Sequence, residues 1–372
     1  MLTLLAAAAS VAQAVPPAPP PPVIRTPAYR PHLVDFDSPS AQCGGRVVMP
    51  LTTVAPFTQV ATIGGDPPRG YLMEFVIGAD GRPLGITQRV ATTTGTGYVA
   101  GSDLAPALSL WRFPASVAGA RCTMTFTARA VPLDGAAVTD LYRVAALQMA
   151  DTTGFQTLIR QIRKSGDCAG PGRPRMLLRA FIDDRRIPQT PGVPSFAVVS
   201  YDVDADGVPQ QPGIVASDGN RVLEGAAADA TARSRYVGNA PRTRCTLPFL
   251  RPATEPVYAP PMPPASAFRE ERCPQPVRWA QPLRQQFPQA FRRRAIEGWA
   301  IVRYDLAPWG ATGAVTVLAA EPAAEFGEQA RRMIAAARAQ PSASGAQGCI
   351  ARVQYRMASD DAAEDDAPPA PF

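Results

Sequence analysis

The sequence is poor in the residues that most catalytic and metal sites need. It contains a single histidine, His32, within "PAYRPHLV" near the N-terminus. A histidine-based metal centre needs a second imidazole, and a Ser-His-Asp triad would depend on this one residue. A Ser-Lys dyad would depend on Lys164, next to Ser165 at what looks like an exposed helix end. We therefore expect no enzyme activity, no catalytic residues and no metal site.

Signatures of nucleotide and nucleic-acid binding are missing too. Residues 92–101, "TTTGTGYVAG", end in no GK[ST] and contain no GxGxxG before a helix, so they predict a flexible loop. The 37 basic and 31 acidic side chains leave a net charge of +6, and the basic ones are scattered apart from Arg292–Arg294. A nucleic-acid-binding protein would show a basic stripe with interleaved aromatics. We expect neither a nucleic-acid partner nor a small-molecule cofactor.

No hydrophobic run is long enough to cross a bilayer. The longest, "MLTLLAAAASVAQA" at residues 1–14, has about a dozen apolar residues and ends in an Ala-x-Ala cleavage pattern. This pattern predicts a secretory signal peptide and a periplasmic location. No Lys or Arg precedes the run, so either the signal is atypical or the true start lies upstream. A longer N-terminus would make the protein anchored in the inner membrane.

Proline is abundant, and its distribution divides the chain. There are 42 prolines and 29 glycines among 372 residues, too many for one uninterrupted globule, although 46% of the residues are apolar. Proline clusters predict extended linkers at residues 15–40 and 251–270. The tail at 359–372 is acidic and proline-rich, which predicts disorder.

The six cysteines reveal an internal repeat. None forms a CxxC pair, which argues against zinc or thioredoxin-type chemistry. Taken as sequential pairs they are separated by 79, 77 and 76 residues, and these near-equal intervals indicate three repeated units. The pairs are Cys43 and Cys122, Cys168 and Cys245, and Cys273 and Cys349.

A strand-and-turn motif keeps step with the cysteines. "FVIGADG", "YDVDADG" and "YDLAPWG" end at Gly81, Gly207 and Gly310, which lie 38, 39 and 37 residues after the first cysteine of each pair. Asp-Gly between strand-like runs is typical of a hairpin, because both residues tolerate positive φ. A calcium loop starting at Asp202 would need a bidentate acid at its twelfth position, which is Gly213. The motif therefore predicts a turn.

The third repeat has the clearest local pattern. Residues 282–298 predict a short helix, 299–320 a hairpin, 321–341 a helix that stops at a proline, and 348–357 a final strand. Helix, hairpin, helix and strand together predict an α+β unit with a small antiparallel sheet.

These residues carry a resemblance. Residues 287–341, "FPQAFRRRAIEGWAIVRYDLAPWGATGAVTVLAAEPAAEFGEQARRMIAAARAQP", resemble the C-terminal domain of TonB-type energy transducers. "MEFVIGADGRPLGITQR" and "LSLWRFPASVAGARCTMTF" resemble it in the first repeat, and "FAVVSYDVDADGVPQQPGIV" more distantly in the second. The resemblance implies three tandem TonB-C-like units: unit one at 41–131, unit two at 167–250 and unit three at 271–358.

Residues 132–166 lie between units one and two. Phe155, Leu158, Ile159 and Ile162 fall at helical i, i+3, i+4, i+7 spacing. This pattern favours a connecting helix docked on a unit, with a partner-binding helix as the alternative.

The cysteine pairs do not belong to the general family pattern. Six cysteines allow 15 connectivities, and the repeat favours Cys43–Cys122, Cys168–Cys245 and Cys273–Cys349. Each bond would clasp the start of a unit to its last strand. Closing a loop of this length stabilises a unit by about 4 to 5 kcal/mol in the chain-entropy model, and an exported protein would keep such bonds oxidised.

The resemblance also implies a function. Proteins of this family bind short extended peptides of outer-membrane receptors as an added strand at a sheet edge. The matching edge in unit three is Ile350, Arg352, Gln354 and Arg356, and in unit one Thr123, Thr125 and Thr127. Alternatively these strands pair with neighbouring units, and the protein is a structural envelope scaffold or contacts cell-wall polymer. A misplaced start would make it a membrane-anchored transducer.

Overall fold

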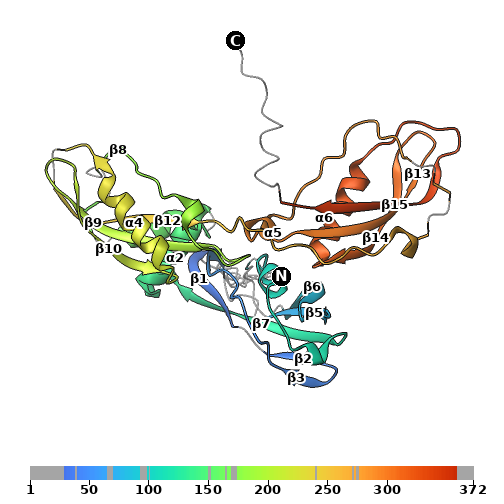
Figure 1. The fold of residues 1–372 in the computed structure, drawn as a ribbon, viewed down its shortest axis with the longest axis horizontal. Coiled ribbons are helices and arrows are strands. Elements are labelled where there is room, and N and C mark those ends of the chain that lie inside the picture. Colours follow the sequence, from blue (N-terminus) through green and yellow to red (C-terminus); the bar gives the residue numbers. More distant parts are fainter. Residues whose placement is uncertain are drawn as a thin grey trace, which may run out of the picture.

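The computed structural model describes residues 29–37, 40–64, 70–92, 99, 101–149, 152–163, 166–168, 174–238, 241–269, 272–273 and 276–357. The predicted signal peptide, Lys164, the acidic tail and most of the loop at 92–101 lie outside these residues. The described chain is a mixture of helices and antiparallel sheets with three disulfides. Figure 1 shows units two and three at opposite ends, with unit one between and below them.

Unit one is built around one long central strand. Its seven strands are β1 (Arg30–Asp37), β2 (Ala41–Cys43), β3 (Arg46–Val48), β4 (Gln59–Ile63), β5 (Gly70–Ile77), β6 (Pro83–Thr92) and β7 (Arg121–Pro132). β7 pairs with β5 on one side and with both β2 and β1 on the other. The short helix α1 (Leu104–Ser109), which is wholly buried, and the buried Trp111 and Phe113 complete the core.

The predicted linker at 15–40 is wrong for its last part. Residues 30–37 form β1, whose Val34 and Phe36 are buried in the core of unit one. Leu33 faces the other way and is buried under the connecting segment. Residues 30–37 form a strand despite the neighbouring prolines, because β1 lies between two packed layers and buries apolar side chains on both of its faces.

Unit two is a three-stranded sheet covered on both faces. Its sheet has the order β10 (Pro209–Ser217), β9 (Ser195–Val203), β12 (Arg242–Arg251), and β8 (Met176–Leu178) pairs separately with β11 (Arg235–Tyr236). Helix α4 (Arg221–Arg233) packs on one face through Leu223 and Ala227. Helix α2 (Val138–Leu147) covers the other face, and the predicted connecting helix is present as α3 (Thr152–Arg163), which packs against α2 and against β1 and β4 of unit one.

Unit three follows the predicted order of elements. Helix α5 (Gln289–Arg293) is shorter than predicted, and β13 (Gly298–Leu306) and β14 (Thr312–Glu321) form the hairpin. Helix α6 (Ala324–Ala336) then precedes β15 (Ala346–Tyr355), giving the sheet order β14-β13-β15. Within the described residues, 3₁₀ turns occur at Ala115–Val117, Leu133–Gly135, Asp184–Arg186 and Ala265–Ala267.

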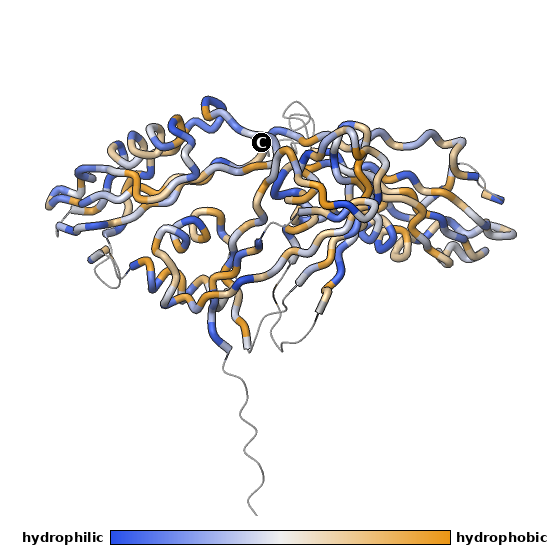
Figure 2. The backbone as a smooth tube through the Cα atoms, turned by 90° about the horizontal axis from the view of Figure 1, so that it is seen from below, coloured by the Kyte–Doolittle hydropathy of each residue, from blue (hydrophilic) through white to orange (hydrophobic). Residues whose placement is uncertain are grey.

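The proline-rich segment at 251–270 is extended, as predicted, but it is packed against unit three. The indole nitrogen of Trp299 donates to the carbonyl oxygen of Pro260 at 2.8 Å, and Trp299 is buried. Val257 bridges to Ile296 in parallel. The segment therefore covers the sheet face opposite α6. Figure 2 shows apolar and polar stretches interspersed along the described backbone.

The same turn geometry occurs in all three units. The carbonyl oxygens of Gly81, Gly207 and Gly310 accept backbone hydrogen bonds of 2.9, 2.8 and 2.8 Å from the chain that follows the helix of the same unit. The donors are Phe113, Tyr236 and Ala339. Each glycine has a positive φ, between +79° and +85°. In unit two the carboxylate of Asp204 accepts from the N–H groups of Asp206 and Val208, so this acid stabilises the turn itself.

A buried ion pair joins the three units. Arg294, which is 1% exposed, donates to both carboxylate oxygens of Asp103 at 2.7 and 2.5 Å. The same guanidinium donates to the carbonyl oxygens of Gly192 in unit two and Ala55 in unit one, and it lies 3.9 Å from the ring centre of Phe57. One side chain of unit three is therefore hydrogen-bonded to both other units.

Replacing the turn glycine of unit three should destabilise it strongly. The Cβ added by Gly310→Ala would lie 2.0 Å from the carbonyl oxygen of Ala339, at a φ of +85°. The left-handed conformation alone costs an alanine about 1–2 kcal/mol, and the clash adds to this. Gly313→Ala on β14, where nothing lies within 4 Å of the new Cβ, is the control. Urea unfolding that shows equal stability for the two variants would contradict this account.

Removing Arg294 should cost about 3–5 kcal/mol of unfolding free energy, because the buried Asp103 carboxylate loses its countercharge. We expect Arg294→Met to shift the urea midpoint strongly, and the exposed neighbour Arg292→Met to leave it almost unchanged. Adding Asp103→Asn to Arg294→Met should restore part of the loss. If the double variant loses as much unfolding free energy as the two single variants lose together, the two residues are not coupled.

Candidate functional site

The edge of unit three formed by β15 is the main candidate site. β15 pairs with β13 on one side, from Ala346 opposite Leu306 to Tyr355 opposite Gly298. Within the described chain, no strand pairs with its other side between Ile350 and Tyr355. An unpaired strand edge presents a row of N–H and C=O groups, which is the template for adding another strand.

The two ends of this edge are partly occupied by the chain itself. At one end Arg272 and Gln347 exchange backbone hydrogen bonds of 3.0 and 3.1 Å, next to the Cys273–Cys349 disulfide. At the other end the side-chain amide of Gln285 donates to the carbonyl oxygen of Gln354 at 2.7 Å. Because this carbonyl points away from β13, the backbone groups of every second residue along β15 face outward.

The side chains at the predicted positions are placed as follows. Arg352 and Gln354 are exposed, Ile350 is half-buried, and Arg356 lies just beyond the end of β15. The Arg352 guanidinium donates to the carbonyl oxygen of Pro263 at 2.6 Å, so the proline-rich segment passes beside this edge. Gln354 and Arg356 line a shallow pocket of about 350 Å³ with Tyr258 and Met262 of that segment.

The predicted edge in unit one is wrong. Thr123 lies opposite Gln42 of β2, and Thr127 lies opposite Asp37 of β1, while Thr125 stands between these two pairings. On its other side β7 is paired to β5. The threonine side chains are exposed, but β7 is a central strand, because the chain before Cys43 runs back along it.

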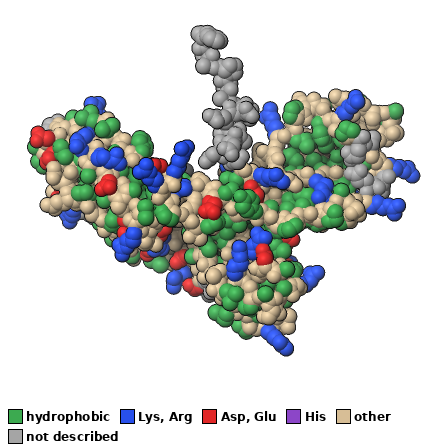
Figure 3. Space-filling model, in the orientation of Figure 1, with side chains coloured by type: hydrophobic (Ala, Val, Ile, Leu, Met, Phe, Trp, Pro, Cys, Tyr) green, Lys and Arg blue, Asp and Glu red, His purple; other side chains and the backbone are tan. Residues whose placement is uncertain are grey.

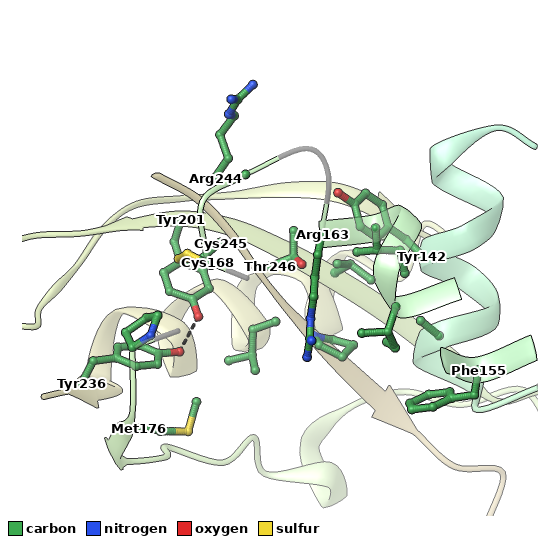
Figure 4. A pocket seen from close by; sticks show the side chains of 18 of the residues that line it. Tyr142, Phe155, Arg163, Cys168, Met176, Tyr201, Tyr236, Arg244, Cys245 and Thr246 are labelled. Carbon is green, nitrogen blue, oxygen red and sulfur yellow. Dashed lines mark hydrogen bonds between the residues drawn. A yellow bond between two sulfur atoms is a disulfide. The ribbon is translucent and has the colours of Figure 1, made fainter. Parts of the chain in front are cut away.

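In unit two, β12 has no strand partner on its outer side among the described residues, an edge that the sequence analysis did not select. β12 is the last strand of its sheet, and a pocket of about 450 Å³ runs beside it, between β12 and α3. Figure 4 shows the Cys168–Cys245 disulfide and the hydrogen bond between the hydroxyls of Tyr201 and Tyr236 at one end, and Phe155 at the other. The helical spacing of Phe155 and Ile159 was the available signal, since both side chains line the pocket.

The opposite edge of unit three, β14, meets unit one. The N–H of Ile86 donates to the carbonyl oxygen of Pro322 at 3.0 Å, and the N–H of Gly85 donates to the Glu321 carboxylate at 2.6 Å. Burial raises the pKa of Glu321 above its ordinary value, and the hydrogen bond from Gly85 partly opposes this. β14 is therefore covered at this end by unit one, and both outer strands of the sheet, β14 and β15, keep stretches without a strand partner among the described residues.

Charge is spread over the molecule. Figure 3 shows Lys and Arg side chains over all three units of the visible face, without one continuous stripe. His32 is in β1, where its ring contacts the carbonyl oxygen of Arg30. Within the described ranges, no three His, Cys, Asp or Glu side chains are grouped to hold a metal. The helices described there are all too short or too polar to cross a bilayer.

Comparison with known protein families gives one match, and it falls on the candidate site. Residues 284–357 match the family described as Gram-negative bacterial TonB protein C-terminal. The match begins just before α5, spans the hairpin and α6, and ends two residues after β15. It covers most of unit three and indicates a TonB-like role in protein interaction at the cell envelope. The match supports one TonB-C-like copy and does not extend to units one and two, so the prediction of three copies is supported for unit three alone. A comparison with curated proteins gives no match.

The raised pKa of Glu321 predicts a pH effect on stability. An acid with a raised pKa in the folded state binds its proton more tightly there, so the stability of the fold falls as pH rises from the ordinary pKa through the raised pKa. Glu321→Gln should therefore raise the melting temperature at about pH 8 and change it less at about pH 4, where the raised pKa favours the neutral form of Glu321.

Glu328→Gln is the matched control with the opposite sign. The hydrogen bond from Arg331 lowers the pKa of Glu328, so its charged form contributes stability that is present at neutral pH and lost in acid. The variant should be slightly less stable than wild type at about pH 8 only, because the pair is exposed. The same pH profile for both variants would contradict the assignment.

Proposed function

We propose that this protein is a periplasmic, TonB-like protein-interaction module that binds extended peptides of outer-membrane receptors by strand addition on β15. The observation that carries the proposal is the unpaired edge from Ile350 to Tyr355, inside the segment that matches the TonB C-terminal family. Strand addition uses backbone groups for affinity and alternate side chains for selectivity. The protein needs no catalytic group for this role, and we propose that it is not an enzyme.

The side chains along β15 favour a particular kind of peptide. Arg352 and Arg356 are cationic and lie on the exposed face of the edge, with Gln354 between them. A peptide strand with acidic or amide side chains at alternate positions would pair with them across the ladder. Without a peptide, the side-chain amide of Gln285 donates to the carbonyl oxygen of Gln354. This side chain is flexible, so an incoming peptide strand can displace it.

We further propose that units one, two and three are diverged copies of one TonB-C-like unit. The support is the repeated hydrogen bond from the chain after the helix to the turn glycine, together with a disulfide in each unit. The copies differ in their edges. Unit one has filled its edge with β1 and β2, and unit three has kept its edge open.

A scaffold role without peptide binding is the second candidate. It is favoured by the Arg294–Asp103 ion pair and by the Ile86–Ala323 bridge, which hold the units together. A membrane-anchored transducer remains a variant of the first proposal, in which the same edge binds a receptor and an upstream segment supplies the anchor.

Strand addition can be tested with backbone-modified peptides. Fluorescein-labelled N-terminal plug peptides of TonB-dependent receptors are titrated against the full chain and followed by fluorescence anisotropy. N-methylation then removes one peptide N–H at a time. We expect losses of about tenfold at every second position and little change between, because only alternate N–H groups bond to the edge.

Two variants of the protein complete the test. Arg352→Pro removes an edge N–H and should weaken binding about tenfold or more, whereas Arg352→Ala keeps the backbone and should weaken it less. Circular dichroism and urea unfolding check that both variants fold. Tight binding that is insensitive to alternate N-methylation would exclude strand addition. No binding by any plug peptide would favour the scaffold.

A further inference from the structure

A groove lined by arginine lies on unit three, away from the β15 edge. It has a volume of about 640 Å³ and runs between α6 and the extended segment 280–286. Arg284 lines one wall, Arg332 and Arg338 line the other, and Leu283 and Met333 are apolar parts of the lining. The segment is held in place by backbone hydrogen bonds of 2.8 Å from Ala280 to Arg338 and from Gln340 to Arg278.

The positive charge of this groove is not balanced by the residues around it. Glu328, one turn before Arg332 on α6, pairs with Arg331 at 3.0 Å and reaches Arg332 only at 4.0 Å. In the part of the chain that the structure describes, no carboxylate pairs with Arg284 or Arg338. Three guanidinium groups around one groove favour an anionic occupant, since each is a permanent cation.

The chain leaves the described structure at one end of this groove. Gln285 donates to the carbonyl oxygen of Gln354, and the rings of Phe287 and Tyr355 are 5.7 Å apart. The end of β15 is therefore in contact with residues 285–287, directly next to Arg284 and Gln286 of the groove. Met357, the last described residue, follows two positions after Tyr355.

The sequence that continues from this point is acidic. Residues 358–372 contain no Lys, Arg or His and five acids: Asp360, Asp361, Glu364, Asp365 and Asp366. Extended chain covers about 3.3 Å per residue, so Asp366 can reach roughly 30 Å from Met357. The groove along α6 from Gln329 to Ala336 is about 10 Å long. The acids can therefore span all three arginines.

We propose that the acidic segment Asp360–Asp366 of this same chain binds in the arginine-lined groove. The charges are complementary, and the covalent link puts the acids at an effective concentration in the millimolar range. The contact weakens with salt, because exposed charges are screened over about 8–10 Å. An anionic partner of the groove must then displace the tail. The proposal does not depend on peptide binding at β15.

Carboxyl-to-amine cross-linking of the full chain tests this directly, because the chain has one native lysine, Lys164. Arg284→Lys or Arg338→Lys places a single amine in the groove. Arg233→Lys places one on α4 of unit two, as a matched control on an exposed helix position. Carbodiimide should couple the groove lysine to residues 360–366 within one chain, with a yield about tenfold above the control. High salt should reduce that yield.

Changing the five acids to amides supplies the second arm. In Arg284→Lys chains with the amide tail the cross-link should disappear, while urea unfolding shows an intact fold. A labelled peptide of residues 358–372 should then bind the amide-tailed chain, and Arg284→Gln with Arg338→Gln should abolish this binding. Cross-links no more frequent than in the control, cross-links only between two chains, or no binding of the peptide would each overturn the proposal.

Discussion

The buried Arg294–Asp103 ion pair is the interaction on which the arrangement of this protein depends. A guanidinium that is 1% exposed is stable only if its hydrogen bonds are satisfied, and Arg294 finds acceptors in Asp103, Ala55 and Gly192. Because the guanidinium group of Arg294 is planar and rigid, its hydrogen bonds fix the relative positions of these three acceptors. Because these acceptors belong to units one and two, α5 of unit three can occupy only one place. The contact between Ile86 and Pro322 then joins the end of β14 to unit one.

The three disulfides occupy equivalent positions in the three units, but the segments that they hold in place differ in structure. Each bond holds the segment before its first cysteine beside the last strand of the unit. In unit one that segment is β1 and β2, which complete the sheet. In unit two it is α3, which leaves a pocket along β12. In unit three, Arg272 alone among the described residues preceding Cys273 bridges to β15, so most of the edge has no strand partner there. The segment before the first cysteine of each unit thus decides whether the edge of the last strand is paired, lies beside a pocket or has no strand partner.

Several of these features could be predicted from residues alone. The hairpin glycines were predictable because a positive φ at an Asp-Gly or similar turn has few alternatives. The pairing Cys273–Cys349 followed from the repeat. The role of Arg294 was not predictable, because within "RRR" one guanidinium is buried while Arg292 and Arg293 are exposed, and only the partners of each side chain distinguish them. The central position of β7, which contains Thr123 and Thr127, could not be predicted either, because exposed threonines occur on both edge strands and central strands.

The sequence by itself determined the local elements and the disulfide pairs, because these depend on short-range periodicity, turn conformations and spacing along the chain. Only the tertiary structure decided which edges are open, where the pocket of unit two lies and how the units meet. These properties depend on hydrogen bonds between residues far apart in sequence, such as Arg294 with Asp103 or Gly85 with Glu321. Whether a backbone N–H meets another strand, a side chain or solvent is set by those distant segments and leaves no mark on the local pattern.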